Sequence, residues 1–149
     1  MIGVDMGDRD EITALVYRYA ELLDAGDMEA VVAMFVNATW RSAATGAALR
    51  TPEEIRAVYD RITLYDGVPR TRHLMNNLVI DHVDGTNDAS GRCYYTVLQS
   101  VEPGAPIEAV VAGRYEDRYH RGANGWHLTD RLFHVDLTAD QSRHFPSNS

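Results

Sequence analysis

Two aspartates at the end of the first apolar periodic segment raise the question of chemistry. Asp24 and Asp27 lie three positions apart in the stretch YAELLDAGDMEAVVAMF. Asp27 follows Gly26, which is expected to end the first helix, so its carboxylate is expected to cap the second helix. Asp24 lies in the last turn of the first helix, where the helix dipole disfavours negative charge and is expected to raise its pKa. Asp24 is therefore either a solvated residue beside the core or a general base.

His73 is the second residue whose type suits acid–base chemistry. It lies in PRTRHLMNN, early in a long predicted strand, and alternation gives it four neighbours on the same face: Thr71, Met75, Asn77 and Val79. This mostly apolar set is typical of a pocket wall, with Asn77 as a polar contact for a ligand. The alternative is a partly buried histidine whose hydrogen bond serves structure alone.

The last two strand-like segments contain a candidate cation and more of the wall. In GWHLTDRLFHVDL, Arg131 and Phe133 share one face. Arg131 is either an outward salt-bridge partner or a buried cation held for an anionic group, since Arg is rarely buried unless paired. In PIEAVVAGRYEDRYHR we expect Val111, Gly113 and Tyr115 to point inward, with Gly113 leaving space that a ligand could fill.

Four further tyrosines are candidates for the pocket. Tyr19 lies in the apolar stripe of the first helix, and its hydroxyl is expected to reach the pocket from the core. Tyr17 shares an edge of the helix with Asp24, beside that stripe. Tyr94 and Tyr95 are consecutive in a strand, so one of them faces the pocket, and alternation alone leaves open which.

These residues are positioned by three predicted helices followed by a sheet. The helical segments begin near residues 9, 28 and 52, and the last one opens with the capping-box pattern TPEE. After Pro69, four long segments rich in β-branched and aromatic residues are joined by the short connections DGTN, EPGA and GANG. This order predicts an α+β fold with an antiparallel meander, which Gly91 and Gly113 would allow to curl into a pocket.

Composition limits the classes of function. The 149 residues are 45% hydrophobic and suit a single domain over residues 1–149, with loose ends at about 1–8 and 141–149. The formal charge of -8 argues against a nucleic-acid partner. No N-terminal apolar segment suggests a membrane span, and the single cysteine, Cys93, has no partner within the chain, so we expect a cytoplasmic protein.

No motif for a metal or cofactor is present in the sequence. The six histidines show no close pairing of the metal-ligand type, and Cys93 is expected to be passive. The sequence also contains no GxGxxG, no phosphate loop and no GxSxG. We therefore expect a reaction that requires neither a metal nor a cofactor.

Several stretches together resemble the SnoaL-like group of the nuclear-transport-factor-2-like superfamily over nearly the whole chain: RYAELLDAGDMEAVVAMF, TPEEIRAVYDRI, TRHLMNN, GRYEDRY and GWHLTDR. The resemblance implies a cone-shaped α+β barrel, in which a strongly bent antiparallel sheet wraps around three N-terminal helices and leaves a deep apolar pocket. Because this superfamily includes enzymes, small-molecule binders and subunits without chemistry of their own, it implies a fold more specifically than an activity.

The resemblance also assigns roles to individual residues. Scytalone dehydratase-like and lindane dehydrochlorinase-like members use an Asp at the end of the first helix with a His on the facing strand, which match Asp24 and His73. Arg131 matches an arginine of the dehydrochlorinase pattern, and Tyr19 matches a tyrosine of bile-acid dehydratase-like members. By this resemblance His73 removes a proton and Asp24 orients it, Arg131 stabilises the leaving group or enolate, and Tyr19 or Tyr94 donates a hydrogen bond.

The sequence also departs from these patterns. The second histidine of scytalone dehydratase falls near Tyr94, and the base aspartate of ketosteroid isomerases falls near Ser42, which argues against both of those routes. Asn37 stands where the family commonly has an aspartate, and we have no account of it.

The sequence thus predicts a dehydratase-like lyase or isomerase that acts on a small apolar cyclic or polycyclic substrate. A small-molecule-binding or polyketide cyclase-like protein is one alternative, and an accessory subunit like the small subunit of ring-hydroxylating oxygenases is another. Apolar residues expected on the outer face of the sheet, among them Leu74, Leu78, Val110 and Ala112, predict a homo-oligomer, either a dimer or a trimer.

Overall fold

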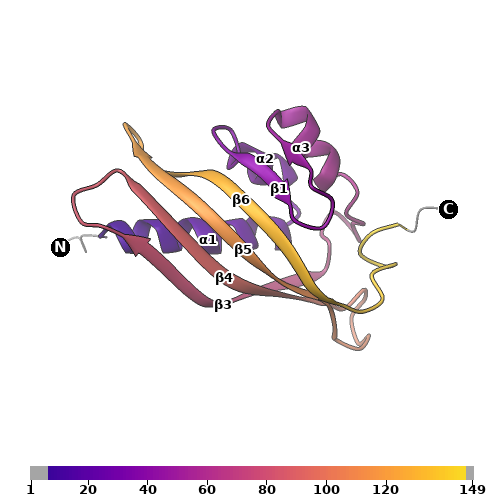
Figure 1. The fold of residues 1–149 in the computed structure, drawn as a ribbon. Helices are drawn as coiled ribbons and strands as arrows, with labels where there is room; N and C mark the ends of the chain where they lie inside the picture. The colour runs from indigo at the N-terminus through magenta and orange to yellow at the C-terminus, as the bar shows by residue number, and fades with distance from the viewer. Residues whose placement is uncertain (1–6, 147–149) are drawn as a thin grey trace, which may run out of the picture.

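Three helices precede the long strands, as the sequence predicts. The computed structural model describes residues 7–146, and its helices are α1 (Asp8–Asp24), α2 (Met28–Ala33) and α3 (Pro52–Tyr59). In Figure 1, α1 extends across one face of the sheet, while α2 and α3 lie together near β1. The apolar stripe of α1 is buried against the sheet, with Ile12 and Val16 fully inaccessible to solvent.

The connection between α1 and α2 determines the direction of the chain beside Asp24. Gly26 has a φ of +77°, and a Cβ on this residue would lie 2.2 Å from the carbonyl oxygen of Gly67. Asp27 then accepts a hydrogen bond from the backbone N–H of Ala30 at 3.1 Å, so its predicted capping role is confirmed. The close approach of Gly67 brings the loop before the first long strand next to the end of α1.

The sheet has six strands in the order β2-β1-β6-β5-β4-β3. The four long strands are β3 (Thr71–His82), β4 (Asp88–Gln99), β5 (Glu108–Gly122) and β6 (Gly125–Thr138), and they form the predicted antiparallel meander. The short strands are β1 (Thr39–Ser42) and β2 (Ala48–Leu49). Because β1 pairs with β6 in parallel, the sheet as a whole is mixed, although its four long strands are antiparallel. The sheet is curved but open, which gives a cone-shaped α+β fold rather than a closed barrel.

The strand pairing of the curved sheet is irregular at several positions. The β3–β4 register shifts between Asn76 and Val79, and the β5–β6 register shifts between Ala112 and Gly113. Such bulges bend a strand and increase its twist. A Cβ at Gly113 would lie 2.0 Å from the carbonyl oxygen of His134, so only glycine fits at this position of β5 beside β6.

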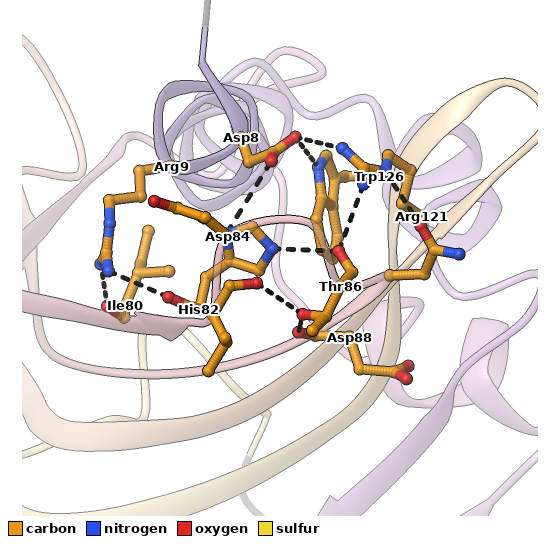
Figure 2. A network of polar contacts seen from close by, with 11 residues as sticks. Asp8, Arg9, Ile80, His82, Asp84, Thr86, Asp88, Arg121 and Trp126 are labelled. Carbon is orange, nitrogen blue, oxygen red and sulfur yellow. Dashed lines mark hydrogen bonds and ion pairs between the residues drawn. The ribbon is translucent and has the colours of Figure 1, made fainter.

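A polar network ties the start of α1 to the far end of the sheet (Figure 2). Asp8 accepts hydrogen bonds from Arg121 Nη1 at 2.7 Å and from the indole N–H of Trp126 at 2.9 Å. Arg9 donates to the backbone carbonyls of Ile80 and His82. The Trp126 hydrogen bond also lowers the pKa of Asp8. The helix is therefore fixed at both ends, here by this network and at its C-terminus by contacts of Asp24.

The C-terminal segment is more ordered than the sequence suggests. Residues 141–146 were expected to be loose, but Thr63 N–H donates to the carbonyl oxygen of His144 at 2.9 Å, and the hydroxyl of Tyr65 donates to that of Arg143 at 2.5 Å. Residues 147–149 and most of the predicted loose N-terminus lie outside the described range. Within residues 7–146, no helix is long and apolar enough to cross a membrane.

Candidate functional site

Asp24 and His73 form a hydrogen-bonded pair between the end of α1 and the start of β3. His73 Nδ1 lies 2.6 Å from Asp24 Oδ1, and the side chains are 8% and 15% exposed, respectively. Asp24 also accepts hydrogen bonds from the backbone N–H of His73 at 2.9 Å and from the hydroxyl of Thr71 at 2.8 Å. Three donors thus fix one carboxylate, and the carboxylate fixes the plane of the imidazole.

These contacts reverse the expected direction of the pKa shift of Asp24. Partial burial raises the pKa of the carboxyl group, but hydrogen bonds from the ring and backbone of His73 and from Thr71 outweigh it. The pKa of Asp24 is therefore lowered, and the expectation of a raised pKa from the helix dipole is wrong. β3 supplies three hydrogen-bond donors to Asp24, and these outweigh the effect of the helix dipole.

An apolar pocket of about 210 Å³ lies on the inner side of His73. Its wall comes from α1, α3, β1, the four long strands and the C-terminal segment. It is lined mainly by aromatic and aliphatic side chains, with Ser42, His73, Gln141 and His144 as polar exceptions: Tyr19, Leu23, Trp40, Val58, Tyr59, Ile62, Tyr95, Val97, Val111, Tyr115, Phe133, Val135 and Phe145. Asp24 instead lines a hollow on the outer side of His73. His73 thus separates the carboxylate from the pocket.

Two tyrosines that line this pocket are hydrogen-bonded to each other through their hydroxyls. The hydroxyls of Tyr19 and Tyr59 are 2.8 Å apart, and the indole N–H of Trp40 lies 3.3 Å from the oxygen of Tyr59. Burial raises the pKa of both phenols, so both stay neutral and can donate hydrogen bonds. Tyr59 and Trp40 were not identified from the sequence, although the i, i+4 spacing of Ile55 and Tyr59 on α3 indicates a buried face.

Arg131 is a buried cation that is paired inside the protein. Its side chain is 2% exposed and donates two hydrogen bonds of 2.8 Å to the carboxylate of Asp117 on β5. The guanidinium lies 4.5 Å from the ring centre of Tyr19 and 4.2 Å from that of Tyr115. Arg131 is therefore a buried cation paired with an internal carboxylate rather than an outward salt-bridge partner, and it supports the aromatic wall without lining the pocket.

The structure brings together most of the residues expected at the site. Val111, Tyr115 and Phe133 line the pocket with Tyr19 and His73. The question left open for the consecutive tyrosines is resolved, because Tyr95 lines the pocket and stacks on Tyr115 at 4.4 Å.

Four expected contact residues do not line the pocket. Tyr94 is 53% exposed and lies with Asn77 in a hollow on the outer face of the sheet. Tyr17 is 44% exposed beside Asp24 on the outer side of His73. At Gly113 the expected free space is occupied, since a Cβ there would lie 2.5 Å from the hydroxyl of Tyr95.

A bulge in β3 explains the error at Asn77. Asn77 has a φ of +53° and lies where the pairing with β4 shifts. The extra residue reverses the alternation, so that Ile80 and His82 are buried while Val79 is 38% exposed. The face predicted for His73 therefore holds only as far as Met75.

His144 is a pocket residue that was not predicted from the sequence. It is 4% exposed, lines the pocket from the C-terminal segment, and has a buried Nδ1 with no hydrogen-bond partner within residues 7–146. Its position beyond the last strand follows no periodic pattern, so only the folded chain reveals it.

The remaining groups with potential reactivity do not form a second centre in the described part of the chain. Residues 7–146 contain no group of three or more His, Cys, Asp or Glu side chains placed to hold a metal ion. Cys93 is 2% exposed, and burial raises the pKa of its thiol to about 11. A thiol with that pKa is a poor nucleophile at neutral pH.

Comparison with protein families gives one match that covers most of the chain. The model of the SnoaL-like domain matches residues 5–132. No curated protein sequence matches this chain significantly.

Several solved structures share the fold. An NTF2-like protein with a cystatin-like fold from Novosphingobium aromaticivorans has a TM-score of 0.70 and 21% identity, with 91% of this chain and 86% of that chain covered. A provisional scytalone dehydratase from the same organism has a TM-score of 0.69 and 21% identity, covering 87% and 84%. The beta subunit of a provisional aromatic-ring-hydroxylating dioxygenase, also from that organism, has a TM-score of 0.67 and 20% identity, covering 91% and 94%.

Proposed function

The chain belongs to the SnoaL-like family, and we propose that it is a dehydratase-like lyase in which His73 is the general base. The observation that carries the proposal is the 2.6 Å contact between Asp24 and His73, with the imidazole at the wall of an apolar pocket. The substrate is a small cyclic molecule with a carbon-bound proton made acidic by a neighbouring group. The reaction is β-elimination of water or a similar leaving group.

The tautomer of His73 follows from its contact with Asp24. An ionised carboxylate only accepts hydrogen bonds, so the proton of the neutral imidazole resides on Nδ1 and Nε2 keeps its lone pair. Nε2 is then the atom that takes the proton from the substrate, and the carbon–leaving-group bond breaks as the double bond forms. The departing hydroxide takes the proton back from Nε2 and leaves as water, which restores the neutral imidazole.

Asp24 supports this step electrostatically. Its lowered pKa keeps the carboxylate charged, and three donors keep it in place beside the ring. When Nε2 takes the proton, the imidazolium lies next to a fixed negative charge in a partly buried site, where that charge is only weakly screened. Asp24 thus orients the base and stabilises the charge that the base acquires.

Tyr19 is the residue that we propose for contact with the leaving group. Tyr19 lines the pocket, and its neutral hydroxyl is held by the hydroxyl of Tyr59. Arg131 acts through this wall, because its charge is paired with Asp117 and its guanidinium packs against the rings of Tyr19 and Tyr115. Arg131 is therefore a positioning residue in this proposal and does not contact the substrate.

The volume of the pocket limits the size of the substrate. An apolar cavity of about 150 Å³ can hold one benzene molecule, and the pocket here measures about 210 Å³. One ring or two fused rings suit this volume better than a larger polycyclic molecule. A pocket lined mainly by apolar side chains also favours a substrate with few polar groups.

The proposal can be tested with 3-hydroxy-1-tetralone, a bicyclic β-hydroxy ketone. Loss of water followed by tautomerisation gives 1-naphthol, whose fluorescence reports the rate. We expect the wild-type protein to form 1-naphthol faster than the variant His73→Gln by about a hundredfold or more, the usual contribution of a general base. Equal rates for the two proteins would reject the proposal.

A binding protein is the second candidate, and the apolar lining of the pocket favours it as well. The same experiment separates the two functions. Tight binding of the tetralone without formation of 1-naphthol, in the wild-type protein and the His73→Gln variant alike, would indicate binding without catalysis.

A further inference from the structure

His144 contributes a polar group to the pocket that the proposed elimination has not yet used. The residue lies in the C-terminal segment, and its backbone is held by bonds from its N–H to the carbonyl oxygen of Gln141 and from Thr63 N–H to its own carbonyl oxygen, both 2.9 Å. Its ring packs edge-on against Phe145 and lines the same pocket as His73. A buried imidazole in a mainly apolar wall needs a hydrogen-bond partner.

The two ring nitrogens of His144 differ in their surroundings. Nδ1 is buried and has no hydrogen-bond partner within residues 7–146. A neutral imidazole carries one N–H donor and one acceptor, and a buried N–H without an acceptor is more costly than an unused lone pair. The proton is therefore expected on Nε2, which makes no hydrogen bond to any residue in the described range.

His144 is also kept neutral by its surroundings. Burial is the main reason that the pKa of its imidazole is lowered to about 4. The nearby His73 also lowers this pKa, and its effect is larger than the opposite effect of Asp24. At neutral pH the side chain is thus an uncharged donor beside the base. A neutral imidazole of this kind can polarise a carbonyl group, a role that histidine takes in other active sites.

We propose that His144 presents Nε2–H to the pocket and donates a hydrogen bond to the carbonyl oxygen of the substrate. This inference rests on the proposed function and deepens it, because it adds a residue that contacts the substrate. His144 is then a catalytic residue from the C-terminal segment, separate from the dyad formed by α1 and β3.

The role of His144 in the reaction follows from where the charge develops. As His73 Nε2 takes the proton from the carbon next to the carbonyl group, the electron pair moves toward oxygen and an enolate forms. The N–H of His144 stabilises that oxygen and keeps its own proton. The carbonyl then re-forms, the β-hydroxyl leaves as hydroxide, and the hydroxide takes the proton from His73 to give water.

The test uses two bound molecules that differ only in the acceptor. 1-Tetralone carries the carbonyl oxygen, and 1-methylenetetralin has a methylene group in its place; neither can undergo the elimination. Dissociation constants are measured by titration calorimetry for the wild-type protein, the apolar variant His144→Phe and the variant His144→Gln, which keeps an N–H donor. No variant touches Asp24 or His73.

One hydrogen bond to a buried acceptor is worth about 1 kcal/mol, so we expect the wild-type protein to favour 1-tetralone by about fivefold to tenfold. The preference is expected to vanish in His144→Phe, with the affinity for 1-methylenetetralin unchanged, and to return in His144→Gln. A preference that persists in His144→Phe, or an equal loss of affinity for both molecules, would overturn the role of His144. Failure of both molecules to bind the wild-type protein would overturn the proposed function as well.

A second measurement needs no substitution. In imidazole ¹⁵N–¹H spectra of the wild-type protein, His144 is expected as the Nε2–H tautomer, and its signal is expected to shift with 1-tetralone but much less with 1-methylenetetralin. An Nδ1–H tautomer, or a signal that does not respond while 1-tetralone binds, would contradict the inference.

Discussion

Arg131 and Asp117 form a two-bonded ion pair that is almost completely buried between β6 and β5, with both contacts at 2.8 Å. The hydroxyl of Tyr119 donates a third hydrogen bond to Asp117 at 2.6 Å. Although burial would lower the pKa of Arg131, the carboxylate of Asp117 raises it, so the guanidinium stays charged. The pair supports the tyrosine wall of the pocket from behind.

The first prediction concerns this pair. Replacing Arg131 with Met leaves the charge of Asp117 buried and unpaired, which typically costs about 3–5 kcal/mol of unfolding free energy. The double variant Arg131→Met with Asp117→Asn removes both charges but keeps an acceptor for Tyr119. We expect the double variant to recover much of the loss in urea denaturation. A double variant that is less stable than the single one would contradict this account of the pair.

The second prediction concerns Gly113, which allows Tyr95 to enter the pocket wall. The variant Gly113→Ala would place a Cβ 2.0 Å from the carbonyl oxygen of His134 and 2.5 Å from the hydroxyl of Tyr95. Overpacking of this kind costs about 1–3 kcal/mol. Gly122→Ala is the matched control on the same strand, since its Cβ would meet only the His127 ring at 3.4 Å. Equal thermal stability of the two variants would show that β5 and β6 can separate at Gly113 without cost.

The third prediction concerns the pH dependence of stability. The pKa of His144 is lowered from 6.5 to about 4 in the folded protein, so the unfolded chain binds its proton first as the pH falls. The contribution of His144 to stability is therefore complete above pH 6.5 and decreases toward pH 4, by up to about 1.4 kcal/mol per pH unit. The variant His144→Gln is expected to lose stability less steeply across that range in urea denaturation. Parallel curves for the two proteins would refute the buried neutral state.

The fourth prediction concerns assembly. The outer face of β3 and β4 exposes Leu74, Val79 and Tyr94 at 39%, 38% and 53%, respectively, and we propose that this face forms a contact between copies of the chain. Val110, which was expected on that face, is 3% exposed, because the β4–β5 register shifts beside it and the C-terminal segment bonds to its carbonyl oxygen.

Light scattering after size exclusion tests this proposal. We expect a dimer or trimer for the wild-type protein and a smaller mass for Tyr94→Lys. Val83→Lys is the control, since Val83 is 71% exposed at the β3–β4 hairpin and lies outside the proposed contact. A wild-type mass equal to the single chain of 16.7 kDa would contradict the proposal.

The fold could be predicted well because its signals are local. Gly26 and Asp27 mark the end of one helix and the cap of the next, and Thr51 with Glu54 forms the predicted capping box. The four long strands likewise follow from composition and short turns. The parallel pairing of β1 with β6 was missed, because a four-residue strand contains no local signal that identifies its partner.

The site could be predicted only in part, because alternation fails where the ladder is irregular. The pairing of Asp24 with His73 was predicted from the resemblance to the SnoaL-like group, and the two side chains are in contact in the structure. Asn77 was misplaced by a bulge that the sequence does not mark, and the choice between Tyr94 and Tyr95 depends on the register with β3. No periodic pattern predicts that His144 is buried, since its burial depends on the path of the chain after β6.

The central claim is that the Asp24 and His73 pair removes a carbon-bound proton in the pocket. Exchange of the C2 protons of 1-tetralone for deuterium in D₂O, followed by proton NMR, measures this step without any leaving group. The account predicts that wild-type protein accelerates exchange by about a hundredfold or more over His73→Gln, with Asp24→Asn markedly slower than wild type. Exchange at the same rate in the wild-type protein and in His73→Gln would contradict it.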